Sequence, residues 1–116
     1  TPGQVVALLD ALAERGLARE RTAVHFHDTY GQALSNTMTA LRHGITTVDS
    51  SAGDWALPYA KSATGNLATE DLIWALEGAG IDTGVDLEAL VATSAWMAGQ
   101  LGRPAPSAVV RALAGA

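Results

Sequence analysis

The residues best suited to chemistry are two histidines one residue apart, His25 and His27, at the end of a short apolar run over residues 22–24. Successive side chains in a strand point to opposite faces, so both imidazoles share one face and Phe26 points away. Asp28 follows at once, where the strand is expected to give way to a helix. Two nitrogen donors beside a carboxylate predict a platform for a divalent metal ion. The spacing alone fits a pair of surface or hydrogen-bonded histidines equally well.

A second set of donors occurs where a loop is expected to run into a helix, over residues 63–71. Asn66 follows a glycine that permits a sharp turn, so its amide oxygen can face a site. Thr69, Glu70 and Asp71 come next, and their composition favours ordinary capping of a helix N-terminus over ligand binding. Imidazole nitrogens combined with amide, carboxylate and water oxygens suit Mg²⁺ or Mn²⁺, with zinc as an open alternative.

The elements that must position these residues alternate between helix and strand. Helix signals cover residues 1–16 and 30–42, β-branched or apolar runs predict strands at 22–28 and 45–49, and a long loop spans 50–66. Three further helices are expected to start at Thr69, Asp86 and Ser107. This order predicts an α/β fold with parallel βαβ units. Two parallel strands cannot cover both of their faces, so residues 1–116 are expected to form one partial domain of a larger sheet or barrel.

Composition limits the classes of partner that the chain is expected to have. The 116 residues are 48% hydrophobic with a mean hydropathy of +0.17, which predicts surface that another chain segment or a second copy covers, hence a homo-oligomer. The net charge is −5 and the seven basic residues are scattered, so neither nucleic acid nor an anionic membrane is an expected partner. There are no cysteines, which excludes thiolate metal ligands and disulfides and predicts a cytoplasmic location. The start at Thr1 suggests part of a longer polypeptide.

Three motifs together closely resemble hydroxymethylglutaryl-CoA lyase, over essentially the whole chain. They are His25-Phe26-His27-Asp28-Thr29-Tyr30-Gly31-Gln32-Ala33-Leu34, Pro58-Tyr59-Ala60-Lys61 and Ala63-Thr64-Gly65-Asn66-Leu67-Ala68-Thr69-Glu70-Asp71. The resemblance implies the C-terminal portion of a TIM (β/α)8 barrel that cleaves an acyl-CoA substrate, 3-hydroxy-3-methylglutaryl-CoA, to acetoacetate and acetyl-CoA. It further implies that His25, His27 and Asn66 bind a divalent cation, Mg²⁺ or Mn²⁺, and that His25 is also catalytic.

Two departures from the family pattern stand beside the resemblance. A TIM barrel needs about 250 residues, and the family's first-strand Arg-Asp pair is absent from this chain. The family's glycine-rich loop ends in a catalytic cysteine, whereas Leu57 stands at that place here. The 116-residue chain is therefore expected to be inactive alone. The alternatives are a non-catalytic half-barrel that self-associates, and another aldolase or Claisen-type member of the same superfamily.

Overall fold

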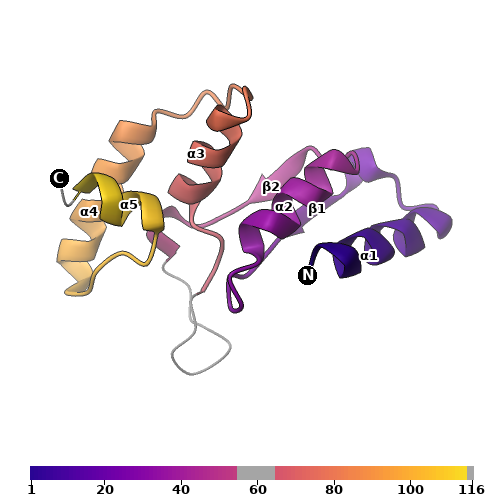
Figure 1. Cartoon of the computed structure of the whole chain (residues 1–116), viewed down its shortest axis with the longest axis horizontal. Coiled ribbons are helices and arrows are strands. Elements are labelled where there is room, and N and C mark those ends of the chain that lie inside the picture. The colour runs from indigo at the N-terminus through magenta and orange to yellow at the C-terminus, as the bar shows by residue number, and fades with distance from the viewer. Residues whose placement is uncertain (55–64, 115–116) are drawn as a thin grey trace.

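The structure is a computed structural model that describes residues 1–54 and 65–114. In chain order, its elements are α1 (Pro2–Glu14), a 3-10 turn η1 (Arg19–Arg21), β1 (Ala23–His25), α2 (Ala33–Arg42), β2 (Thr47–Asp49), a 3-10 turn η2 (Ala52–Asp54), α3 (Thr69–Gly78), α4 (Leu87–Leu101) and α5 (Ala108–Ala114). Figure 1 shows α1, α2 and the two strands at one end of the molecule and α4 with α5 at the other.

The two strands form a parallel pair, and α2 makes the crossover between them. In the register, Ala23 lies opposite Thr47 and His25 lies opposite Asp49. Parallel strands joined by a helix carry their carboxyl ends to the same edge of the sheet. The histidine segment and the segment after β2 therefore leave the sheet side by side.

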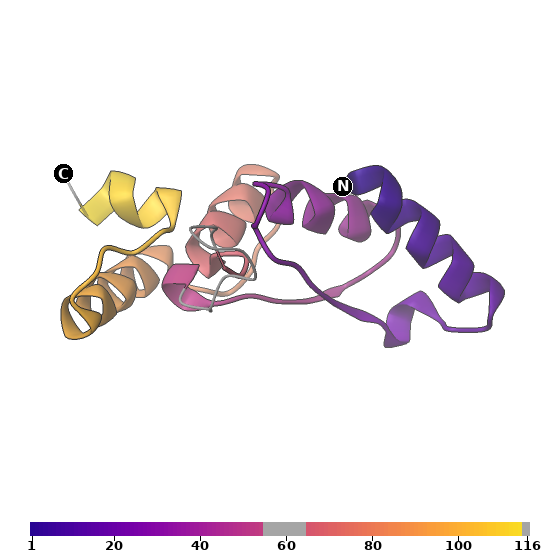
Figure 2. The same cartoon turned by 90° about the horizontal axis from the view of Figure 1, so that it is seen from below.

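Helices cover only one face of the strand pair. Val24 and Phe26 pack on a core of buried residues from α1, α2 and the turn that follows α2, namely Val5, Leu9, Ala40 and Ile45. Figure 2 shows α1 and α2 on the same side of the strands. The opposite face, with Ala23 and His25 on β1 and Thr47 and Asp49 on β2, is exposed. This uncovered face is the one on which the first histidine lies.

Two smaller cores complete the packing. Ala33 of α2, Leu72 of α3 and Leu67, which precedes α3, are buried together beneath Phe26 and Val48. A separate cluster of Val91, Ala105 and Val110 holds α4 against α5. The chain of small cores gives an extended molecule of 46 × 34 × 19 Å, with a radius of gyration of 15.0 Å.

The α/β fold with parallel strands is confirmed, but the expected strands are too long. The strand predicted over 22–28 ends at His25, and the helix predicted from Tyr30 begins at Ala33. The intervening turn has Gly31 at φ 68°, and the Asp28 carboxylate accepts a hydrogen bond from Ala33 N at 2.8 Å, so the helix starts where this cap allows. The described strands form a two-stranded sheet and do not close a barrel.

Candidate functional site

The two histidines lie together at the carboxyl end of β1. Their ring centroids are 5.0 Å apart in an edge-on arrangement, with 67° between the ring planes. His25 is the last residue of the strand, whereas His27 lies beyond it and is half-buried. The alternation of side chains persists past the strand end because residues 26–28 pair with a different segment, the one that carries Asn66.

Residues 65–67 run antiparallel to the histidine segment. Asp28 N donates to Gly65 O at 2.8 Å and Leu67 N donates to Phe26 O at 3.0 Å. Between these two hydrogen bonds, Asn66 faces His27 as an isolated antiparallel bridge. The structure thus brings Asn66 next to the histidine pair, although Asn66 and His27 are 39 positions apart in the sequence. Their role as ligands stays a prediction.

Asp49 is a neighbour that the sequence analysis missed. It ends β2 directly opposite His25, and the Nδ1 atom of His25 forms a very short contact with its carboxylate. A carboxylate on one ring nitrogen fixes the ring and leaves the other nitrogen, Nε2, for a ligand or a proton. No local sequence pattern predicts this pairing, because it depends on the register of the two parallel strands.

Glu70 and Asp71 do not cap α3, as their composition had suggested. Ala68 is the N-cap residue, and Thr69 is the first residue of the helix. Glu70 is fully buried, where both carboxylate oxygens accept from Gly53 N at 3.0 Å and Oε1 also accepts a very short hydrogen bond from the Ser94 hydroxyl. Glu70 therefore fastens the segment after β2 to α3 and α4.

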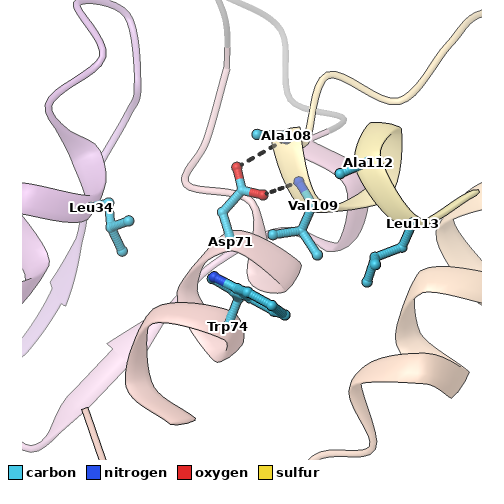
Figure 3. A pocket seen from close by; sticks show the side chains of 7 residues that line it. All are labelled: Leu34, Asp71, Trp74, Ala108, Val109, Ala112 and Leu113. Atoms are coloured by element: carbon cyan, nitrogen blue, oxygen red, sulfur yellow. Dashed lines mark hydrogen bonds between the residues drawn. The ribbon is translucent and has the colours of Figure 1, made fainter. Parts of the chain in front are cut away.

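Asp71 holds α5 in place. Its Oδ1 accepts from Ser107 Oγ at 2.7 Å and from Val109 N at 2.9 Å, and its Oδ2 accepts from Ala108 N at 3.3 Å. Figure 3 shows the carboxylate reaching the start of α5 at the rim of a groove of about 430 Å³. The rest of this groove is mostly apolar, and it is lined by Leu34, Trp74, Ala108, Val109, Ala112 and Leu113.

Asp54 is the most perturbed acid of the chain. It is only 6% exposed, and burial raises its pKa from 3.8 to about 6 against the opposing effect of a hydrogen bond from Gly65 N. The negative charges of Asp28, Asp71 and Glu70 raise it further. Its backbone has φ 59°, a left-handed conformation that is uncommon outside glycine. Sequence reasoning missed Asp54 because the burial arises from segments distant along the chain.

The donor chemistry fits a divalent cation, since two imidazoles and an amide oxygen are acceptable ligands for Mn²⁺ or Mg²⁺. Within residues 1–54 and 65–114, no three His, Cys, Asp or Glu side chains gather in a way that could hold a metal ion, so a third ligand depends on the Asn66 amide. Leu57 and the Pro58-Tyr59-Ala60-Lys61 motif lie outside the described residues. None of the helices in the described part is long and apolar enough to cross a membrane.

Fold and site together define a class: a parallel βαβ unit that gathers polar side chains where its strands end, as in α/β enzymes. Residues 1–97 match the HMGL-like family, and the chain belongs to that family. The mitochondrial hydroxymethylglutaryl-CoA lyase of Arabidopsis thaliana is 49% identical over 97% of this chain and 24% of its own length. The lyase YngG of Bacillus subtilis is 47% identical over 91% of this chain and 36% of its own length.

Solved structures agree with the sequence relatives. The Bacillus subtilis HMG-CoA lyase superposes with a TM-score of 0.92 and 43% identity, over 98% of this chain and 38% of that protein. An Acinetobacter baumannii HMG-CoA lyase in complex with coenzyme A and 3-methylmalate superposes with a TM-score of 0.85 and 34% identity, over 97% and 37%. The resemblance to hydroxymethylglutaryl-CoA lyases is confirmed. This chain spans about a quarter to two fifths of the length of these relatives.

The cytoplasmic location expected from the sequence is contradicted by the same relatives. The plant lyase and the human lyase, which is 48% identical over 97% of this chain, are both named as mitochondrial, although bacterial relatives match as well. The expectation was wrong because it rested on the lack of cysteine. A chain without cysteine has no disulfides, but this does not identify the compartment in which it works.

Proposed function

We propose that this chain is the C-terminal, cation-binding part of a hydroxymethylglutaryl-CoA lyase, a carbon–carbon lyase acting on an acyl-CoA. The observation that carries the proposal is the approach of Asn66 to the His25 and His27 pair at the carboxyl ends of parallel strands. This is the end at which (β/α)8 barrels build their active sites. The family membership and the lyase relatives support the same assignment.

In this proposal, His25, His27 and Asn66 hold Mg²⁺ or Mn²⁺. When bound, the cation supplies a Lewis acid that stabilises charge on the substrate oxygens. Asp49 keeps the His25 ring oriented through Nδ1, so the side chain presents Nε2 to the site. Asn66 is held by the backbone pairing of its two neighbours with the histidine segment, which fixes its position without using its side chain.

The same arrangement bears on the two roles, cation binding and catalysis, that the family resemblance implies for His25. Cleavage of the bond in 3-hydroxy-3-methylglutaryl-CoA begins when a base removes the proton of the tertiary hydroxyl. With Nδ1 on Asp49, only Nε2 of His25 remains, and one nitrogen cannot bind a cation and accept a proton at once. Substituting His25 should therefore identify its role. A loss of cation affinity indicates that Nε2 binds the cation, and a loss of turnover at unchanged cation affinity indicates that Nε2 transfers the proton.

The rest of the barrel is also part of the proposal. The uncovered strand face carries His25 and Asp49 and would become the interior once further βα units close the barrel. The exposed edges of β1 and β2 offer unpaired backbone groups to such strands. The complete site would then combine residues of this chain with residues of the added strands.

The test is an acetoacetate assay on two proteins. The first is the 116-residue chain, which we expect to show no turnover with Mg²⁺ or Mn²⁺. The second, termed the fused lyase, is the Bacillus subtilis lyase in which this chain replaces the segment that superposes on it. We expect the fused lyase to release acetoacetate and to lose at least 100-fold in kcat when His27 becomes Ala. A folded fused lyase that binds 3-hydroxy-3-methylglutaryl-CoA without cleaving it would contradict the proposal.

A further inference from the structure

The side chain of Asp54 has one oxygen that the fold leaves unused. Its Oδ2 accepts a hydrogen bond from Gly65 N at 3.3 Å. The residue is 94% buried. Its Oδ1 is buried with it and has no hydrogen-bond partner. A buried carboxyl oxygen without a partner costs free energy, and a catalytic role is one of the explanations for such a group.

This oxygen belongs to a residue that lines a small pocket at the proposed site. The pocket has a volume of about 220 Å³, and its wall includes Asn66, Asp54, Asp28 and Ser107. Asn66 is a proposed cation ligand, so the pocket adjoins the proposed cation site through this residue, whereas His25 and His27 do not line it. Glu70 holds Gly53, the residue before Asp54, by two hydrogen bonds, which fixes the carboxyl group at the pocket.

The surroundings keep a proton on Asp54 at higher pH than on an ordinary aspartate. Burial is the main cause, and the carboxylates of Asp28 from the histidine segment and of Asp71 and Glu70 from α3 add repulsion. The pKa of about 6 lies close to neutral pH, in the range in which a group both holds and releases protons readily. The chain contains no cysteine, so a thiol of its own cannot serve this purpose.

We propose that Asp54 is the acid that protonates the carbon leaving group in the lyase reaction. This inference rests on the proposed function. A base takes the hydroxyl proton of the substrate, the oxygen electrons form the new ketone of acetoacetate, and the broken carbon–carbon bond leaves its electron pair on the carbon next to the thioester carbonyl. Asp54 donates its proton to that carbon, which gives acetyl-CoA. The proton removed from the hydroxyl then restores the acid, so protons and electrons balance over the cycle.

The test uses Asp54→Asn in the fused lyase. The amide keeps an acceptor for Gly65 N but cannot donate the proton, so kcat for acetoacetate should fall by about 10²–10⁴-fold. Exchange of the methyl protons of acetyl-CoA with D₂O needs the same acid without the cleavage step, and it should fall in parallel. Mn²⁺ affinity should stay within twofold, which a collapsed site would not allow. Asp82→Asn, in an exposed turn, is the matched control and should change none of the three.

Two results would overturn the inference. The first is an active fused lyase in which Asp54→Asn keeps kcat and methyl-proton exchange within threefold. The second is a carbon-13 NMR titration in which the Asp54 carboxyl group loses its proton near pH 4, because no proton would then remain at neutral pH. An inactive fused lyase with unchanged Asp54 would instead contradict the proposed function, so the two failures are distinguishable.

Discussion

The pairing of Asp49 with His25 makes the first prediction, at the scale of single residues. Asp49→Asn removes the charge that orients the imidazole through Nδ1, and loss of such an outer partner typically lowers metal affinity by about 10–100-fold. Both side chains are partly exposed in the chain alone, so we expect the lower end, about tenfold, for Mn²⁺ binding to the fused lyase. Asp10→Asn, which removes a surface ion pair with Arg19, is the control. Unchanged Mn²⁺ affinity would show that Asp49 does not position the ring.

Asp54 gives a prediction about stability and pH. Its pKa is about 6 in the folded chain and 3.8 when unconstrained, so the folded state holds the proton more tightly than the unfolded state. The free energy of unfolding should therefore fall as pH rises from about 4 to about 6 and stay low above that, by about 3 kcal/mol in total. Asp54→Asn should abolish this loss. Urea unfolding at pH 4 and pH 7.5 measures it.

The two pH values make the comparison internal. The variant should be more stable than the parent at pH 7.5 by clearly more than at pH 4, whatever constant effect the amide has on the left-handed backbone. A difference that is equal at both pH values would mean that the buried carboxyl group carries no proton near neutrality. Greater stability with slower turnover is the pattern expected of a group retained for chemistry.

Sequence spacing predicts the placement of some of these residues but not of others. The period of two in a strand places His25 and His27 on one face, and the Gly65-Asn66 turn suggests an exposed amide, so their types and local geometry were predictable. Asp49 and Glu70 act on partners 24 and 17 residues away, His25 and Gly53. Such pairings depend on strand register and helix packing, which the sequence alone does not encode in any local pattern.

At the scale of elements, α5 depends on a residue of α3. Asp71 accepts three hydrogen bonds from residues 107–109, and a charged acceptor shared by several donors is among the stronger kinds of hydrogen bond. Asp71→Ala should release α5 and lower its opening free energy by about 2 kcal/mol. Amide hydrogen exchange of Val110 and Arg111 measures this change.

The control for α5 is Glu77→Ala on the same helix, because Glu77 is exposed and a surface substitution there should have little effect. Equal exchange of α5 in Asp71→Ala and in the parent chain would show that the cluster of Val91, Ala105 and Val110 holds the helix unaided. Exchange that accelerates across α4 as well would mean that the two helices open as one unit.

Element types were more predictable than element ends. The caps at Asp86 and Ser107 were expected and are present, since Asp86 accepts from Ala89 N and Ser107 accepts from Val110 N. The strand at His25 is shorter than predicted because the segment after His25 pairs with residues 65–67 and no longer with β2. A change of partner of this kind is a tertiary effect, which propensity and periodicity do not report.

At the scale of the whole molecule, the uncovered sheet face predicts self-association. The radius of gyration, 15.0 Å, exceeds the value of about 13 Å that a compact domain of this length would have. Large exposed apolar side chains, such as Leu8, Trp74 and Trp96, add to the bare strand edges. Light scattering of the chain at rising concentration should show dimers or larger species, and a stable monomer at high concentration would contradict this.

The most direct test of the central claim is an NMR titration of the 116-residue chain with Mn²⁺, whose unpaired electrons broaden nearby signals. We predict that the imidazole signals of His25 and His27 and the side-chain amide of Asn66 broaden first. His43 is the internal control, because its ring contacts Thr39 O at the far end of α2. Its signal should broaden only at higher Mn²⁺. Broadening of His43 at the same Mn²⁺ concentration, or sharp His25 and His27 signals throughout, would contradict the proposed cation site.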